Sequence, residues 1–234
     1  MTGIPIATAA LPSLKVSNDK HFIIQEDGTP FFWLADDAWG LHNRLNLKDA
    51  KRYLDTRKAQ GFTVIHTWLA SSWMRQNRNG DEPFQGAINN TKSIRLNEAF
   101  FDHVGKVIDL AEERELYLVL EIGKVLRNNV SKWWIGGFGS HQDHVKKAYE
   151  YGWRLAQVLK KRGQARSNLI WGLGQDTHPQ GSKKVGSKNA ANGARKFKEL
   201  VQSMAEGLAD ATNNQSLNSH DGRADYSTTL MSFH

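Results

Sequence analysis

Short apolar runs alternate with amphipathic stretches along this chain, and this order of elements restricts the possible folds more than any other feature. Buried strands are predicted at 31–34, 63–68, 116–120, around Ile170 and at 228–233. Helices are predicted from Asn46 to about Gln60, from Asn97, from about His141 to Lys161, and around Phe197 to Leu208. Since strands and helices alternate without an antiparallel meander, the pattern indicates parallel βαβ units.

Two architectures are built from parallel βαβ units, the doubly wound sheet and the eight-stranded barrel. The segment 34–39, after the first predicted strand, has no glycine for the tight turn of a dinucleotide-binding fold. Polar loops follow the predicted strands, and in (β/α)8 barrels the chemistry lies in those loops. The sequence therefore favours the α/β class with a (β/α)8 TIM-barrel architecture, preceded by a short β-hairpin within Leu14 to Ile24.

The length of the chain bears on how much of a barrel it can form. A complete barrel has about 250 residues, whereas this chain has 234 residues and five predicted strands. We therefore expect residues 14–234 to form a partial barrel that is truncated after the fifth strand. Residues 1–13 are expected to be a disordered or leader remnant without the basic start of a signal peptide, so localisation is left open.

The composition excludes several classes of protein. The fractions of charged residues, 24%, and hydrophobic residues, 39%, are those of a soluble globular domain. The chain has no cysteine, which excludes disulfides and cysteine-ligated zinc. No apolar run approaches the roughly 20 residues that span a bilayer, so no membrane partner is predicted.

The net charge of +7 raises the question of nucleic acid. The basic residues gather at 146–147, 160–162 and 183–198, without the interleaved aromatic residues on which bases stack. They are interpreted as solvated helix faces and a loop, and no specific nucleic-acid partner is predicted. His141 and His144 have a spacing that could hold a metal ion, but no third ligand is evident. No metal or cofactor is predicted.

The stretch from Leu169 to Asp176 contains the strongest candidate for a catalytic group. A short apolar run ends abruptly in Gly174, Gln175 and the carboxylate of Asp176, and a polar loop follows. In α/β barrels a carboxylate at this place is a candidate acid, base or ligand. The alternative is that Asp176 only caps a turn, and the local sequence does not decide between these two interpretations.

Several aromatic and polar residues lie where predicted strands give way to loops. The chain has eight tryptophans, and five of them fall in such places: Trp39, Trp68, Trp73, Trp133 and Trp134. Each could be a core residue, but a group of them suits stacking against the faces of sugar rings. Carboxylates and histidines that could bind the same sugar follow the strands as well: Asp36, Asp37, Glu121, His178 and His234. His66, within a strand, is interpreted as a packed core histidine.

Five stretches of the chain carry a resemblance to a known family. They are Asp27 to Trp39, Arg57 to Ile65, Asn97 to Val104, Asn168 to Asp176 and Thr229 to His234. On these residues the chain resembles the apiosidase-like glycoside hydrolases, a barrel family formerly catalogued as a domain of unknown function. The resemblance implies a (β/α)8 barrel that binds an oligosaccharide or polysaccharide and uses two catalytic carboxylates.

The resemblance also implies roles for individual residues. Asp176 matches the general acid/base at the fourth strand, and Asp36 matches an aspartate of the sugar-binding cleft, with Trp39 beside it. Gln175 and Asp37 depart from the family pattern, in which a glycine and a threonine stand there. The nucleophile of the family is a glutamate on a later strand, and no residue here corresponds to it.

The implied activity is retaining hydrolysis of a glycosidic bond in a plant-type, pectic polysaccharide, with Asp176 as acid/base. Retention requires a second carboxylate as the nucleophile. Because no residue matches that carboxylate, two alternatives stand beside the enzyme. One is a catalytically inactive carbohydrate-binding remnant, and the other is a gene-model fragment without an independent role.

Overall fold

The computed structural model describes residues 11–71, 73–88, 93–126, 135, 139–174, 188–215, 218–221 and 230–232, of which 188–191, 218–221 and 230–232 are described by their backbone alone. Within these ranges a sheet of six parallel strands follows the order of the chain. The strands are β3 (Ala35–Asp37), β4 (Val64–Trp68), β5 (Tyr117–Glu121), β6 (Leu169–Gly172), β7 (Asn218–Asp221) and β8 (Leu230–Ser232). A parallel order without crossover to the other edge is the arrangement of a (β/α) barrel.

Helices connect the successive strands from β3 to β7. They are α1 (Leu41–Arg44), α2 (Leu47–Ala59), α3 (Glu98–Glu112), the short 3-10 helix η1 (Gly123–Leu126), α4 (His141–Val158) and α5 (Lys188–Thr212). The predicted starts at Asn46 and Asn97 are confirmed, because each side chain accepts a hydrogen bond from a backbone N–H of the first turn. The helix α4 begins after Ser140, which forms a capping box with Asp143, and ends before the predicted Lys161.

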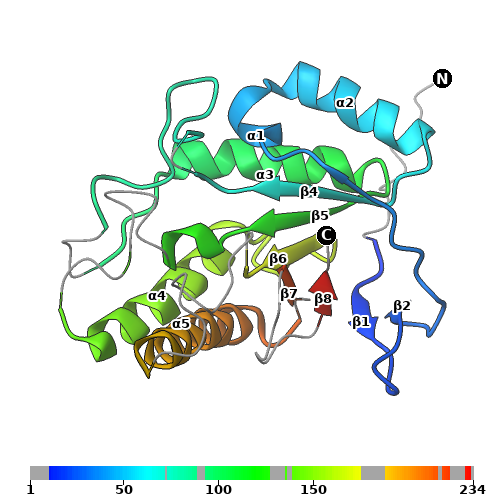
Figure 1. The fold of residues 1–234 in the computed structure, drawn as a ribbon. Helices are drawn as coiled ribbons and strands as arrows, with labels where there is room; N and C mark the ends of the chain where they lie inside the picture. Colours follow the sequence, from blue (N-terminus) through cyan, green and yellow to red (C-terminus); the bar gives the residue numbers. More distant parts are fainter. Residues whose placement is uncertain are drawn as a thin grey trace, which may run out of the picture.

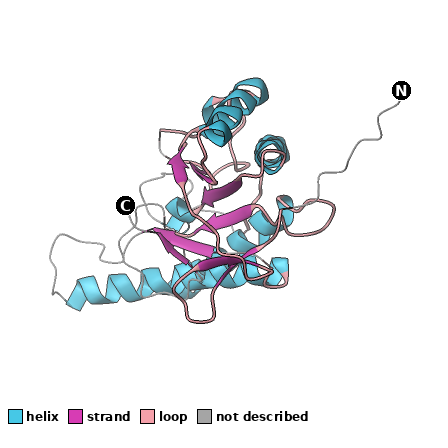
Figure 2. Ribbon diagram, turned by 90° about the vertical axis from the view of Figure 1, so that its right-hand side faces the viewer, coloured by secondary structure: helices cyan, strands magenta, loops and turns pink. Residues whose placement is uncertain are grey.

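The two faces of the sheet bury different sets of side chains. Alternate residues such as Ile65 and Leu118 belong to the main core, into which the helices pack. The residues between them, among them Val64 and Val119, form a second, smaller core on the other face. Figures 1 and 2 show the helices along one side of the curved sheet, as in the wall of a barrel.

A β-hairpin closes the end of the sheet at which the strands begin. The strands β1 (Leu14–Val16) and β2 (Ile23–Gln25) pair antiparallel and lie to the right in Figure 1. Leu14 belongs to the small core of the inner face, and the Tyr117 hydroxyl donates a hydrogen bond of 2.6 Å to the Pro12 carbonyl. Since the hairpin covers the amino ends of the strands, their carboxyl ends are left for the functional loops.

Two expectations about the strands were wrong. The first strand of the sheet is Ala35–Asp37 and not 31–34. The apolar run at 31–34 instead packs Phe31 and Trp33 against the core beneath the hairpin, while Phe32 is 74% exposed. The sheet also continues one strand further than expected, because Asn218–Asp221 pairs between β6 and the strand at Leu230–Ser232. The sequence did not predict the strand Asn218–Asp221, because its residues are polar and its pairing is made by backbone hydrogen bonds and not by side chains.

Lys147 was also misplaced by the sequence analysis, which assigned it to a solvated helix face. Its side chain is buried, with 7% exposed, and its ammonium donates a hydrogen bond of 3.2 Å to the Ile88 carbonyl. Burial lowers the pKa of Lys147 below its ordinary value, and the neighbouring Glu150 opposes this shift. Lys147 thus links the helix α4 to the long loop after β4, which the charge count alone could not indicate.

The buried histidine His42 gives the fold a pH dependence. Burial is the main reason that the pKa of His42 falls to about 4. In the unfolded chain the ring takes up a proton below about pH 6.5, whereas in the folded state it stays neutral until about pH 4. We therefore expect the free energy of unfolding to fall by on the order of 3 kcal/mol as the pH drops through this window. Urea unfolding between pH 7 and pH 4 measures this loss.

The His42→Gln variant separates this contribution from that of the other titrating groups. The variant is expected to be less stable at pH 7 but to lose less stability between pH 6.5 and pH 4, because glutamine does not titrate. Equal pH slopes for the two proteins would contradict the assignment.

Candidate active site

The carboxyl ends of β4, β5 and β6 bring three residues to one level on the inner face of the sheet. Trp68 pairs in register with Glu121, and Glu121 pairs in register with Gly172. They alternate with Thr67, Leu120 and Trp171, which are buried within the sheet and its helix-facing core. This level is the place where parallel α/β folds build their sites.

The carboxylate of Glu121 is buried at the centre of this level. Only 2% of Glu121 is exposed. A Cβ atom added to Gly172 would lie 2.2 Å from Glu121 Cδ and 2.4 Å from each carboxylate oxygen. The carboxylate thus lies directly against the α-carbon of Gly172, and a larger residue there would have to displace it.

A second close approach joins the backbone just after β6 to the start of η1. A Cβ added to Gly123, two residues after Glu121, would lie 2.1 Å from the Leu173 carbonyl oxygen. The backbone of Leu173 and Gly174 therefore passes directly over the start of η1. Gly174 is the last described residue before Gln175 and Asp176.

Asp37 and His66 lie next to each other on the strands β3 and β4. Asp37 pairs in register with His66, and its carboxylate lies 3.7 Å from His66 Nδ1. The His66 ring is buried and meets the edge of Trp33 at a centroid distance of 6.5 Å. This arrangement matches the packed histidine that the sequence analysis expected, with a carboxylate as a neighbour.

Asp36 was expected in the sugar-binding cleft, but its contacts place it on the opposite face of β3. Its carboxylate accepts hydrogen bonds from the Tyr53 hydroxyl and, at 2.5 Å, from Arg57 Nε, both on the helix α2. Burial, followed by the hydrogen bond to Asp36, raises the pKa of Tyr53 to about 12. Successive strand residues point to opposite faces, so Asp36 anchors the strand to α2, while Asp37 lies beside the inner-face residue His66.

Three tryptophans form a continuous aromatic surface at the carboxyl ends of β3 and β4. Trp39 and Trp68 stack with a centroid distance of 4.7 Å and an interplanar angle of 11°, and Trp73 meets Trp68 at 5.8 Å. Trp39 is 44% exposed and Trp73 is 55% exposed. Lys124 Nζ lies 5.0 Å from the centroid of the Trp68 ring. Exposed, stacked indoles are the side chains on which sugar rings pack.

Several predicted site residues lie outside the described residues: Gln175, Asp176, His178 and His234, with the loop tryptophans Trp133 and Trp134. The structure brings together Trp39, Trp68 and Glu121 from the predicted set. It adds Lys124 and Arg44, which the sequence analysis did not single out. Their position, a few residues past a strand end, is a signal that could have drawn attention to them.

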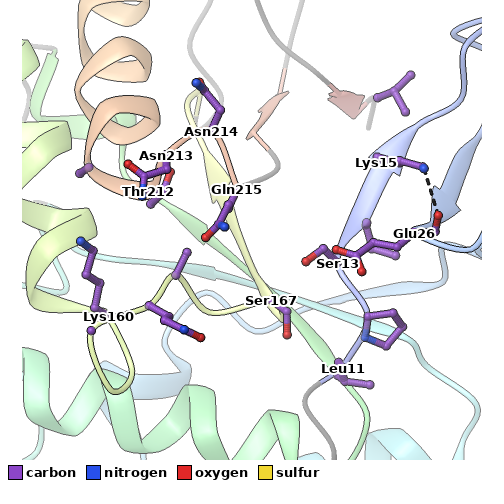
Figure 3. Close-up of a pocket in the computed structure, with 17 residues that line it drawn as sticks. Leu11, Ser13, Lys15, Glu26, Lys160, Ser167, Thr212, Asn213, Asn214 and Gln215 are labelled. Carbon is purple, nitrogen blue, oxygen red and sulfur yellow. Dashed lines mark hydrogen bonds between the residues drawn. The ribbon is translucent and has the colours of Figure 1, made fainter.

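A large cavity lies at the other end of the sheet. Its volume is about 980 Å³, and it opens between the hairpin, the start of β6 and the end of α5 (Figure 3). Lys15, whose ammonium donates to the Glu26 carbonyl at 3.0 Å, and Ser167 and Gln215 line it. A smaller hollow of about 360 Å³ lies on the carboxyl side, between Arg44 and the loop from Trp73 to Asn77. The candidate site is on this second side, because the chemistry of parallel α/β folds is found there.

The histidine pair on α4 has other partners. His141 Nε2 lies 2.5 Å from Glu199 Oε2, and Asp143 caps its own helix. Among the described residues no group of three metal-ligating side chains is present. None of the helices in the described part of the chain is long and apolar enough to cross a bilayer.

Comparisons with known proteins agree with this fold. The model of the apiosidase-like catalytic domain matches residues 17–234. A solved glycoside hydrolase superposes with a TM-score of 0.66 at 25% identity, over 95% of this chain and 43% of its own. A family 5 glycoside hydrolase from Bacteroides vulgatus superposes with a TM-score of 0.65 at 20% identity, over 90% of this chain and 39% of its own.

An endo-1,4-beta-mannanase from Rhizomucor miehei shares the fold at 12% identity, with a TM-score of 0.60 over 89% of this chain and 60% of its own. No curated protein sequence matches significantly. The chain spans less than half the length of the two glycoside hydrolase structures above.

Proposed function

Because the chain belongs to the family of apiosidase-like catalytic domains, we propose that it provides the acid/base half of a retaining glycosidase site for a plant-type, pectic polysaccharide. Asp176 is the proposed general acid/base. Trp39, Trp68 and Glu121 are proposed to line the sugar-binding cleft, together with Asp37, Gln175, His178 and His234. A retaining reaction needs a second carboxylate as the nucleophile.

One observation carries the carbohydrate part of this proposal. The exposed indole of Trp39 stacks on the half-buried indole of Trp68, and both lie at the same end of the sheet as the buried carboxylate of Glu121. An apolar, planar surface beside a buried acceptor is suited to a sugar, which has apolar ring faces and hydroxyl groups around its edge. If these residues were only part of the protein core, Trp39 would be buried.

The proposed chemistry of Asp176 follows from its place in the chain. A general acid must hold its proton near neutral pH, so its carboxyl must be in surroundings that raise its pKa. Gly123 lets the strand extension with Leu173 and Gly174 pass close to the segment that follows Glu121. A buried carboxylate near this extension is the kind of neighbour that favours the neutral form of a second carboxyl group.

Hydrolysis of aryl glycosides and pectic oligosaccharides, by the wild type and by Asp176→Asn, tests the function. If the chain turns over any of them, Asp176→Asn is expected to lower kcat/KM by about 10³-fold, the range for general acid/base groups. Asp102→Asn is the matched control, because Asp102 lies on α3 in an exposed ion pair with Lys106. It is expected to leave turnover unchanged.

The alternatives have distinct outcomes in the same experiment. Saccharide binding without turnover by the wild type would favour the carbohydrate-binding alternative over catalysis by this chain alone. Turnover that survives Asp176→Asn would contradict the assignment of the acid/base. If the wild type neither binds nor hydrolyses any of these saccharides, the carbohydrate function as a whole would be contradicted.

A further inference from the structure

The backbone of Trp39 is held by two consecutive residues of the strand β4. The Trp39 carbonyl accepts a hydrogen bond of 3.1 Å from the Trp68 N–H and one of 3.3 Å from the Thr67 hydroxyl. Thr67 is fully buried and lies on the face of β4 opposite to Trp68, because successive strand residues alternate between the two faces. Trp68 thus provides the ring on which Trp39 stacks, and Thr67 provides a second anchor for the Trp39 backbone.

The hydroxyl of Thr67 is itself held by a buried histidine on α1. His42 Nδ1 lies 3.4 Å from Thr67 Oγ1. At the other side of the ring, Nε2 donates a hydrogen bond of 3.1 Å to the Leu69 carbonyl, so Nδ1 of the neutral ring is an acceptor. The Thr67 hydroxyl therefore lies between two acceptors, the Trp39 carbonyl and His42 Nδ1, and both contacts restrict its position.

Neighbouring elements keep this histidine in place. The His42 ring meets the Phe100 ring of α3 edge-on, with a centroid distance of 5.9 Å and an interplanar angle of 90°. Leu69, which accepts the hydrogen bond from His42, donates its own N–H to the Glu121 carbonyl of β5 at 2.9 Å. The anchor of Trp39 is therefore built from β4, β5, α1 and α3.

The side chain of Trp39 depends on this anchor because much of it is exposed. Trp39 is 44% exposed, and its ring stacks on Trp68 at a centroid distance of 4.7 Å. Close packing on all sides confines a ring in the core, but it does not confine a half-exposed ring. The N-cap residue of α1 is Gly40, which offers no side-chain hydrogen bond to the segment after Trp39. The position of the Trp39 backbone therefore determines where its indole lies on Trp68.

We propose that Thr67, oriented by His42, is a positioning residue that holds Trp39 in its stack on Trp68 and so sets the affinity of the cleft for a saccharide. The proposal rests on the carbohydrate function above and adds a buried residue that does not touch the sugar. Thr67 acts through the Trp39 carbonyl. A stack that is already ordered binds a sugar ring at a lower entropic cost than one that becomes ordered only on binding.

The variant Thr67→Val tests the hydroxyl, because valine has nearly the same shape but no hydrogen-bond donor. Stacked indoles give an exciton couplet in the far-ultraviolet circular dichroism spectrum, and the difference between the wild type and Trp39→Phe isolates the contribution of Trp39. Thr67→Val is expected to lose most of this contribution. By isothermal titration calorimetry, it is expected to bind a pectic oligosaccharide about fivefold more weakly than the wild type, the factor for one lost hydrogen bond.

Three further variants control the test. Thr67→Ser keeps the hydroxyl, and we expect it to keep both the couplet and the affinity. Thr67→Cys has a weaker donor, so intermediate values are expected, and it replaces the valine variant if that variant does not fold. Thr212→Val is the matched control, because Thr212 is a buried threonine at the other end of the sheet whose hydroxyl donates to the Leu208 carbonyl at 2.8 Å. It is expected to lower stability and to leave the couplet and the affinity unchanged.

Each remaining outcome contradicts a distinct statement. An unchanged couplet in Thr67→Val, or equal losses in Thr67→Val and Thr212→Val, would overturn the positioning role of Thr67. A lost couplet with unchanged affinity would overturn the link between the stack and the cleft. The couplet is measured without a saccharide. If the wild type bound no saccharide, the carbohydrate function would be contradicted, and the couplet would still show whether Thr67 positions Trp39.

Discussion

The variants Gly152→Ala and Gly207→Ala are each expected to lower the free energy of unfolding by about 3 kcal/mol. A Cβ added to Gly152 on α4 would lie 2.1 Å from the Met204 carbonyl oxygen on α5. In the reverse direction, a Cβ added to Gly207 on α5 would lie 2.1 Å from the Tyr149 carbonyl oxygen on α4. Both glycines are buried, and the opposing atoms belong to helix backbones, so the helices must separate to admit a methyl group.

The intrinsic helix preference acts in the opposite direction. Alanine is favoured over glycine within a helix by about 1 kcal/mol, which offsets only part of the steric cost. Gly193→Ala provides the control, because Gly193 lies on α5 with no atom within 4 Å of an added Cβ. Urea unfolding should show a gain of up to about 1 kcal/mol for this variant and a large loss for the other two. Equal effects at the three positions would contradict the close approach of α4 and α5.

The variant Gly172→Ala is expected to destabilise the chain by about 2–3 kcal/mol and to displace the Glu121 carboxylate. The added Cβ would lie within 2.4 Å of three atoms of that carboxyl group. A side chain on the surface would move aside at small cost. Glu121 is only 2% exposed, so its carboxylate must be forced into packed surroundings or its strand must shift.

A double-mutant cycle isolates this contact. In a Glu121→Ala background the carboxyl group is absent, so Gly172→Ala is expected to cost close to nothing there. The cycle should therefore yield a coupling free energy of about 2 kcal/mol, large for two adjacent residues. A coupling near zero would mean that the carboxylate does not lie against Gly172, and the level of inner-face residues would need revision. Saccharide binding by the same variants shows whether the position of Glu121 matters for the cleft.

The sequence predicted most of the elements because their signals are local. Asn46 and Asn97 cap helices through hydrogen bonds to residues two or three positions away. The strands β5 and β6 are largely apolar runs, and β4 is apolar except for His66 and Thr67, as expected for strands buried on both faces. By contrast, β7 has the polar sequence Asn218–Asp221, and it is recognised as a strand only because it pairs with β6 and β8.

The prediction of the site was limited by the orientation of side chains. Asp36 and Asp37 are neighbours in the sequence and both follow an apolar run, yet their contacts lie on opposite faces of β3. The run at 31–34 was taken for that strand, so the register that decides the two faces could not be read. A shift of one residue exchanges the faces of a strand.

Alternation, caps and strand ends are short-range patterns, so the amino-acid sequence alone indicates the α/β class, the family and the places where chemistry is concentrated. Which of these residues meet depends on how the strands and helices pack together. The stacking of Trp39 on Trp68, the burial of Glu121 against Gly172 and the position of Arg44 over Trp73 each join segments from different βα units. Such contacts depend on the register of the parallel strands, which is fixed by the packing of the whole sheet and not by any local run of residues.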